Sequence, residues 1–143
     1  MNIELTTSPS AEDAKTISRA LLNYNYKAAK DLEPESAYIT FSIFARDEKG
    51  TINGGLRATC FWNTLHIELC WVSEEIRMQG IGSKMVKKAE AFAAEKGFEQ
   101  ALLETTDWQA EPFYKKLGYK IIATIPQYPK GHVMHFMTKT LEF

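Results

Sequence analysis

Three stretches of the chain repeat apolar residues every three or four positions, which is the spacing of one helix face. The first begins at Ser10, whose hydroxyl can cap a helix with the acid Asp13 three residues on, and it ends near Pro34. The second and third end at Gly97 and Gly118, a residue type that commonly terminates helices. We expect three helices whose apolar stripes face the core. The stripes are Ala14, Ile17, Leu21, Tyr24 and Ala28; Ile81, Met85, Ala89 and Phe92; and Ala110, Phe113, Tyr114 and Leu117.

Between these stretches the hydrophobic period is two, as in a β-strand. The glycine pair Gly54-Gly55 predicts a bulge in the second strand of a three-strand meander. In the third strand of the meander, one face should be core and the other should carry polar chemistry. These two faces are Leu65, Ile67, Leu69 and Trp71, and His66, Glu68, Cys70 and Val72. The expected strands cover residues 2–7, 38–45, 51–62, 65–72, 98–105, 119–125 and 132–141.

The order of these elements defines a fold class. It is strand, helix, three-strand meander, helix, strand, helix and two strands. This order predicts an α/β (α+β) chain with a mixed, mostly antiparallel sheet of about seven strands and a central strand–helix–strand crossover. No linker-like or low-complexity tract interrupts the 143 residues, so we predict one domain over residues 1–143.

Composition excludes two classes of protein. Hydrophobic residues make up 45% and charged residues 24%, as in folded globular proteins rather than disordered ones. No apolar run approaches the roughly 20 residues that span a bilayer, and the chain does not start with a basic segment followed by an apolar one. We therefore expect no membrane partner.

The two cysteines, Cys60 and Cys70, lie in consecutive strands of a hairpin that we predict to turn at Asn63-Thr64. Such a turn would place Cys60 opposite Ile67 rather than opposite Cys70. A hairpin that keeps the two thiols apart favours a reduced protein, and we predict a cytoplasmic location.

Charge is distributed unevenly along the chain. Residues 1–76 hold 7 Lys/Arg and 11 Asp/Glu, whereas residues 77–143 hold 10 and 7, which gives net charges of −4 and +3. An anionic ligand is therefore expected on the second half. The chain as a whole is not basic enough for extended contact with nucleic acid.

A glycine-containing turn, Arg77-Met78-Gln79-Gly80-Ile81-Gly82-Ser83, follows a predicted strand and opens a predicted helix. The first N–H groups of a helix have no partner within it, and a residue without a Cβ lets a phosphate approach them. The P-loop pattern fails because Gly82 is followed by Ser83-Lys84, and the dinucleotide fingerprint fails because Met85 replaces its third glycine. The turn indicates another kind of phosphate site, or glycines that only ease helix packing.

The turn fits the pattern Arg/Gln-x-x-Gly-x-Gly/Ala and resembles the coenzyme A pyrophosphate loop of the GNAT N-acetyltransferase superfamily. About 30 residues further on, Pro112-Phe113-Tyr114-Lys115-Lys116-Leu117-Gly118-Tyr119 resembles the other recurring signature of that superfamily. The resemblance covers about residues 65–141. The first 60 residues match the superfamily in element order more than in residues.

This resemblance implies acetyl-CoA as cosubstrate and direct transfer of the acetyl group to a primary amine of a small molecule or peptide. It implies a proton donor to the leaving sulfur at Tyr114, and a main-chain N–H at Val72 that polarises the thioester carbonyl. Core packing is the alternative for Tyr114, and helix capping is the alternative for Gln109. The cofactor-binding residues that it implies are Trp71, Val72, Arg77, Met78, Gln79, Gly80, Ile81, Gly82, Ser83, Gln109 and Tyr114.

An alkyl amine with a pKa of about 10.4 is almost fully protonated at neutral pH, so the transfer needs a base. Glu68 and His66 point the same way from their predicted strand, and either could accept the proton directly or through water. We place Glu68 first and His66 second. The position of His66, eleven residues before Arg77, resembles the place where some GNAT relatives have a glutamate base. Solvated surface side chains are the alternative for both.

Other functions stay open at this point. A non-catalytic acyl-CoA-binding module of the same fold would share the glycine turn, and an interaction protein would need no nucleotide site. His132 and His135 would face opposite sides of a strand and lack companion carboxylates, so we expect no metal. Homodimer formation through an edge strand or the C-terminal segment is also left open.

Overall fold

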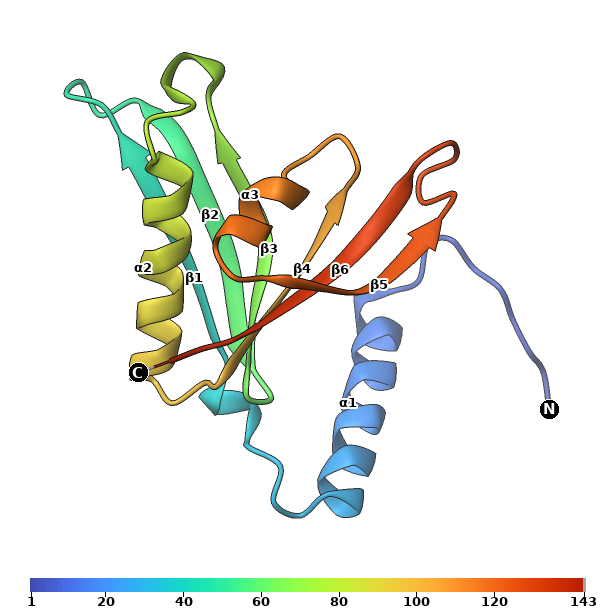
Figure 1. Ribbon diagram of the computed structural model, residues 1–143. Helices are drawn as coiled ribbons and strands as arrows, with labels where there is room; N and C mark the ends of the chain where they lie inside the picture. The colour runs from blue at the N-terminus through green and yellow to red at the C-terminus, as the bar shows by residue number, and fades with distance from the viewer. Residues whose placement is uncertain (143) are drawn as a thin grey trace. The chain divides into compact units, whose positions relative to one another are not determined.

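The computed structural model describes residues 1–142, and the chain divides into two compact units, residues 1–34 and the part from Glu35 onward. The helices are α1 (Ala11–Ala28), α2 (Ile81–Glu95) and α3 (Glu111–Lys116), with short 3-10 turns at Glu35–Ala37 and Glu74–Ile76 (Figure 1). The strands are β1 (Ile39–Arg46), β2 (Ile52–Phe61), β3 (Thr64–Val72), β4 (Gln100–Thr106), β5 (Lys120–Pro126) and β6 (Val133–Thr140). That residues 1–143 form one domain stays a prediction.

The first unit holds α1 and the segment before it. Ser10 caps α1 as predicted, because its Oγ accepts the N–H of Asp13 at 3.1 Å. The strand predicted at residues 2–7 is wrong, since an extended segment becomes a strand only when it pairs with a neighbour, and this one joins no ladder. The prediction of a buried stripe is also wrong within this unit, where α1 has no second element to pack on and Ile17 and Leu21 are exposed.

The second unit is built on a six-stranded sheet in the order β1-β2-β3-β4-β6-β5. Strands β1 to β3 form an antiparallel meander, and β4, β6 and β5 form a second antiparallel group. The β3–α2–β4 crossover joins the two groups through a parallel pairing. This is the mixed, mostly antiparallel sheet with a central crossover that the periodicities predicted, with six strands instead of about seven because residues 2–7 do not contribute one.

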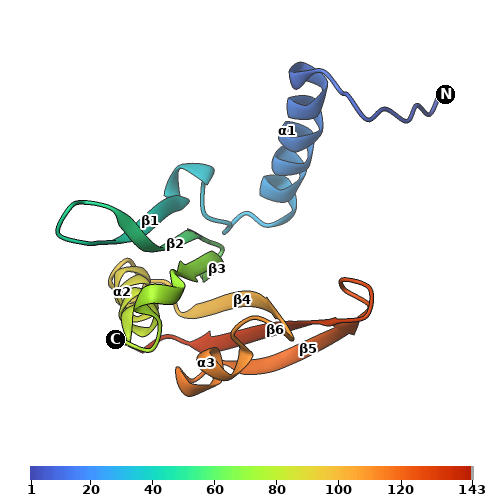
Figure 2. The same cartoon turned by 90° about the horizontal axis from the view of Figure 1, so that it is seen from above.

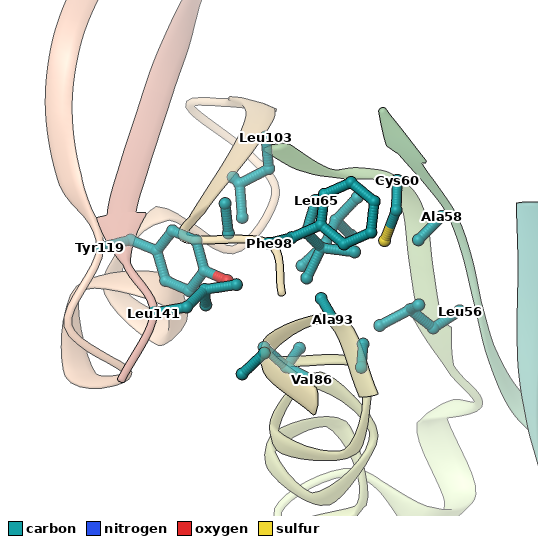
Figure 3. Packing of buried hydrophobic residues seen from close by; sticks show 14 of the residues in the cluster. Leu56, Ala58, Cys60, Leu65, Val86, Ala93, Phe98, Leu103, Tyr119 and Leu141 are labelled. Atoms are coloured by element: carbon teal, nitrogen blue, oxygen red, sulfur yellow. The ribbon is translucent and has the colours of Figure 1, made fainter. Parts of the chain in front are cut away.

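The core lies on the face of the sheet that α2 and α3 cover (Figure 2). Leu65 of β3 and Val86 of α2 are both fully buried there (Figure 3). The predicted end points of these helices are confirmed, because Gly97 and Gly118 follow α2 and α3 with φ angles of 95° and 97° that favour glycine. The helices therefore fix one face of the sheet.

The β2–β3 hairpin turns one residue earlier than predicted. Trp62 and Asn63 have φ angles of 48° and 59°, the backbone of a two-residue type I′ turn. Cys60 consequently pairs in register with Leu65 instead of Ile67, and Cys70 pairs with Leu56. The two thiols are kept apart, as expected, although the register that separates them is different.

A β-bulge in β3 changes which residues face the core. The register with β2 shifts between Arg57 and Ala58, which leaves Glu68 as the extra residue. Beyond Glu68, Cys70 and Val72 pack against the core, whereas Leu69 and Trp71 are 45% and 51% exposed. The strict alternation predicted for residues 65–72 is therefore wrong after Glu68. The predicted bulge near Gly54-Gly55 is present as a register shift at the adjacent Asn53.

Candidate functional site

The centre of the sheet opens where β3 and β4 stop pairing. The parallel pairing covers only Thr64–Ile67 of β3 and Gln100–Leu103 of β4, and both strands continue beyond it (Figure 1). On their outer sides β3 stays paired with β2, and β4 stays paired with β6. We call the separated segments, Glu68–Val72 and Glu104–Thr106, the strand opening. Its two edges present backbone groups of interior strands that do not bond to each other.

Val72 directs its backbone into this opening. The N–H of the next residue, Ser73, donates to the carbonyl of Asn53 on the β2 side at 2.8 Å. Because backbone groups alternate along a strand, the N–H and C=O of Val72 point to the other side, toward the opening. The carbonyl accepts a hydrogen bond from Arg77 Nε at 3.0 Å. The Val72 N–H therefore faces the strand opening, and its role as a donor to a carbonyl oxygen stays a prediction.

The glycine turn follows β3 and forms the first turn of α2. Met78 and Gly80 both have positive φ, 68° and 76°, and Gly80 is the N-cap. The first hydrogen bond within the helix runs from Lys84 N–H to the Gly80 carbonyl at 3.0 Å. The N–H groups of residues 81–83 therefore have no acceptor within the helix, and Lys84, Lys87 and Lys88 lie in the following turns. Helix ends of this kind suit anions, and anion binding here stays a prediction.

Glycine is favoured at the two positions of the turn for different structural reasons. A Cβ on Gly80 would meet open space, so the positive φ is what favours glycine there. A Cβ on Gly82 would lie 3.2 Å from Phe113 Cζ and 3.6 Å from Val72 Cγ2. Gly82 thus allows α3 and the end of β3 to approach α2 closely, which is the packing explanation weighed above. Gly80 leaves the approach to the helix end open.

Arg77 holds the turn onto β3. Its Nε donates to the Val72 carbonyl, and its Nη1 lies 3.9 Å from the Glu74 carboxylate. Met78 and Gln79 are exposed, and Ile81 packs partly against the core. Arg77 therefore positions the glycine turn, and its own contact with a phosphate stays a prediction.

Tyr114 lies on the helix side of the strand opening. It is 7% exposed and shares a hydrogen bond with Cys70 of β3, while its ring packs edge-on against Phe113 and Tyr119 at centroid distances of 5.0 and 5.8 Å. Burial, and then the neighbouring Cys70 thiol, raise the pKa of Tyr114 well above its usual value, so the phenol stays protonated. Burial likewise raises the pKa of the Cys70 thiol. The alternation predicted from the sequence concealed this contact, because it placed Cys70 on the opposite face.

A buried polar network lies next to Tyr114 at the C-terminal end of α3. Tyr119 Oη donates to Glu90 Oε2 at 2.8 Å, and Lys139 Nζ bonds both carboxylate oxygens of Glu90 at 3.0 and 3.1 Å. Burial, and then the Glu90 carboxylate, raise the pKa of Tyr119. Tyr119 is thereby fixed against Tyr114. The network is structural, since all three partners satisfy one another.

Gln109 turns its side chain back onto the end of β4. Its Oε1 accepts the Thr106 N–H at 3.0 Å, and Thr105 Oγ1 accepts the Ala110 N–H at 3.3 Å. These bonds shape the loop that leads into α3, but the N-cap of α3 is Ala110 and no side chain caps the helix, so the capping role considered for Gln109 is wrong. A cofactor contact by Gln109 stays a prediction.

The two predicted bases lie on the face of the sheet opposite α2, and their surroundings differ. Glu68 is held by Arg57 Nε at 2.9 Å and by the Thr59 hydroxyl. The Thr59 bond first, and Arg57 as well, lower the pKa of Glu68. His66 is half-buried, stacks on Phe61 at a centroid distance of 4.3 Å, and has a lowered pKa because of burial. His66 is therefore neutral at pH 7 and can accept a proton, whereas both oxygens of Glu68 are already engaged.

The edges of the strand opening fit a ligand with amide groups. Ser73 Oγ at the end of β3 and Thr106 Oγ1 at the end of β4 are buried and lack a hydrogen-bond partner in the protein. Such orphaned hydroxyls are costly, and a polar group inserted between the strands can satisfy them. A cavity of about 550 Å³ between α2 and β6, lined by Lys87, Glu90 and Lys139, contains none of the predicted site residues. We place the site at the strand opening.

Within residues 1–142 the structure contains no cluster of His, Cys, Asp and Glu side chains suited to a metal ion. His132 pairs instead with Asp107, whose Oδ1 lies 3.0 Å from His132 Nδ1. Among the helices of the same residues, none is long and apolar enough to cross a membrane.

Comparison with known proteins gives this architecture a family. The acetyltransferase (GNAT) family profile matches residues 5–119. A blasticidin-S acetyltransferase from Streptomyces morookaense is 37% identical over 124 residues, which cover 86% of this chain and 87% of that protein. A thialysine N-epsilon-acetyltransferase from Bos taurus is 43% identical over a shorter stretch of 56 residues, 38% of this chain and 33% of that protein.

The structural comparison agrees. The crystal structure of an acetyltransferase from Bacillus cereus superimposes with a TM-score of 0.83 and 30% identity, over 96% of this chain and 98% of that one. The chain belongs to the GNAT acetyltransferase family. It is accordingly an N-acetyltransferase with acetyl-CoA as its cosubstrate, as the two signatures implied.

Proposed function

We propose that this enzyme transfers the acetyl group of acetyl-CoA directly to a primary amine of a small molecule, without an acyl-enzyme. The observation that carries the proposal is the strand opening. Its edge presents the Val72 N–H, its helix side holds the Tyr114 hydroxyl next to Cys70, and the glycine turn of α2 begins five residues after Val72. A thioester arm lying between the strands would meet both donors.

Three groups of the chain would act in the transfer, one on the coenzyme's pyrophosphate and two on the reacting atoms. The N–H groups of residues 81–83 would hold the pyrophosphate of acetyl-CoA, which supplies the activated acetyl group. The Val72 N–H would stabilise charge on the carbonyl oxygen while the amine nitrogen bonds to the carbonyl carbon. The C–S bond would then break and Tyr114 Oη would donate its proton to the leaving sulfur. The second proton lost by the amine nitrogen as the amide forms would restore the Tyr114 hydroxyl.

The contacts favour His66 over Glu68 as the group that takes the proton of the amine. Glu68 is committed to Arg57 and Thr59, whereas the ring of His66 is neutral at pH 7 and lies on the same face. His66 would accept the proton directly or through water before the nitrogen attacks.

The names of the relatives support a small-molecule acceptor. The two similar proteins reported above are acetyltransferases of blasticidin-S and of thialysine, both small molecules. A peptide acceptor, a homodimer and a cytoplasmic location stay predictions.

The test is thiol release from acetyl-CoA with a panel of polyamines, aminoglycosides and amino acids. We expect turnover with at least one amine and a sharp loss in Tyr114→Phe. Tyr119→Phe is the matched control, because it removes a hydroxyl from the same aromatic group and should lower stability rather than kcat. Binding of acetyl-CoA without turnover on any acceptor would instead support a non-catalytic acyl-CoA-binding module.

A further inference from the structure

Glu104 is a carboxylate on an interior strand, at the point where the sheet opens. Its neighbour Leu103 makes the last pairing of β4 with β3, opposite Ile67, so Glu104 is the first residue of β4 beyond the junction. Leu103 and Thr105 on either side of it are buried against the helices. Because side chains alternate along a strand, Glu104 points to the opposite face, where it is exposed.

That face also carries His66. The register pairs His66 with Leu102, and Glu104 lies two residues beyond Leu102 on the same side of β4. The proposed proton acceptor and Glu104 therefore flank the same end of the junction. Tyr114 and the glycine turn lie on the helix side, so the acyl donor and the acceptor would approach the opening from opposite faces.

Glu104 differs from Glu68, which holds the equivalent first position beyond the junction on β3. Both oxygens of Glu68 are engaged, by Arg57 and by Thr59. Among the described residues the Glu104 side chain has neither a hydrogen bond nor an ion pair, while its backbone pairs with β6. A carboxylate at this position attracts a cation that the chain itself does not supply.

The charges around the strand opening differ between the two faces of the sheet. The lysines at the start of α2 lie on the side that would receive the anionic coenzyme. We call the opposite face of the sheet, which carries His66 and Glu104, the acceptor face. The arginine on that face, Arg57, is paired with Glu68. An alkyl amine with a pKa of about 10.4 arrives as an ammonium ion at neutral pH. Charge therefore directs the amine to the acceptor face and the coenzyme to the helix face.

We propose that the Glu104 carboxylate binds the ammonium group of the acceptor and so restricts the enzyme to cationic amines. Glu104 holds the nitrogen at the edge of the opening until the proton leaves, and it is a specificity residue that touches the substrate. This inference rests on the proposed function and names the substrate class of the same site.

The test measures equilibrium binding and turnover separately. Binding of putrescine and of spermidine to the CoA-saturated protein is followed by calorimetry in the native chain, in Glu104→Gln and in Glu95→Gln. Glu95 is the matched control, because it is an exposed glutamate at the far end of α2 that receives the same change of charge. Butanediol, which is neutral and of similar length to putrescine, serves as the uncharged ligand.

We expect at least one of the two amines to bind the native chain and to bind Glu104→Gln about tenfold more weakly, as for a hydrogen bond to a charged group. Glu95→Gln should bind it normally, and butanediol should not bind. Equal affinity in Glu104→Gln and the native chain, an equal loss in Glu95→Gln, or no binding of either amine would overturn the assignment of Glu104.

The proposed function has its own readout in acetyl transfer. With a turned-over amine, Glu104→Gln should raise KM about tenfold while the KM for acetyl-CoA stays unchanged. If amines are acetylated and Glu104→Gln leaves their KM unchanged, the proposed function stands and the role of Glu104 fails. If amines bind through Glu104 and no acetyl transfer occurs, the role of Glu104 stands and the proposed function fails.

Discussion

The two halves of the β3–β4 junction have the same strands and opposite properties. In the paired half, Leu65 and Ala101 face each other in register and are completely buried. In the open half, the bulge at Glu68 shifts the register with β2 and pairing with β4 ends one residue earlier, at Ile67. One extra residue thus coincides with the change from a strand paired on both sides to a strand whose inner edge is unpaired. Stability and chemistry are divided along the length of one strand.

Loss of the Tyr114 hydroxyl is expected to have the largest effect on the open half. Tyr114→Phe keeps the ring that packs against Phe113 and Tyr119 but removes the proton donor. Since acid catalysis typically contributes about 10²-fold or more, kcat should fall by at least about that factor while acetyl-CoA affinity is retained. Steady-state kinetics and calorimetry measure the two quantities. Undiminished kcat would show that the sulfur finds its proton elsewhere.

Truncation in the paired half should act on stability alone. Leu65→Ala removes a side chain that is fully buried between β3 and α2, and it should lower the free energy of unfolding by about 3 kcal/mol. Urea denaturation measures this loss. The acetyl-CoA affinity of the fraction that remains folded should match that of the native chain. A weaker affinity at full folding would show that the two halves are not independent.

The pH dependence should identify the base on the acceptor face. Burial holds the pKa of His66 below its usual 6.5, and only the neutral ring accepts a proton. kcat should therefore decline from its plateau as pH falls, with a midpoint below pH 6.5. His66→Gln should lower the plateau about tenfold and abolish this decline, because water would replace the ring. An unchanged profile in His66→Gln would assign the proton to another acceptor.

Alanine variants of the two glycines in the turn should have the smallest effects. They test whether each glycine is needed for close packing or for its backbone conformation. Gly82→Ala places a Cβ 3.2 Å from Phe113 Cζ, and we expect acetyl-CoA affinity to fall about threefold as the ring moves away. Gly80→Ala meets no atom but must adopt a φ of 76°, which should cost about 1 kcal/mol of stability. Thermal unfolding and calorimetry of both variants test the distinction. Identical behaviour would contradict it.

Much of the second unit followed from periodicity and punctuation. The α2 and α3 stripes with their terminal glycines, the meander and the crossover were all readable, because burial and turn formation impose regular spacing. The strand expected at residues 2–7 was not, since pairing partners are not encoded locally. The first unit also lacked the packing surface that its amphipathic pattern led us to expect.

Motifs in the sequence selected candidate site residues, whereas a single backbone irregularity that shapes their surroundings could not be predicted. The glycine turn and Tyr114 were selected from their signatures, and their roles in the site stay predictions. The bulge at Glu68 has no residue-type signal, and without it Cys70 was assigned to the wrong face and its contact with Tyr114 was missed. The engagement of Glu68 by Arg57 and Thr59 depends on the register across β2, which the sequence placed one residue off.

The crossover junction also has a mechanical consequence. Two antiparallel ribbons of three strands meet through four register pairs, whereas β4 and β6 share seven. Separating the two groups of strands at the β3–β4 pairing breaks fewer main-chain hydrogen bonds than separating the strands within either group. Local opening of the structure should therefore concentrate at the β3–β4 pairing. A coenzyme bound between β3 and β4 would link the two groups of strands. Hydrogen exchange of the backbone amides of both strands should then be slower in the coenzyme-bound protein than in the free protein.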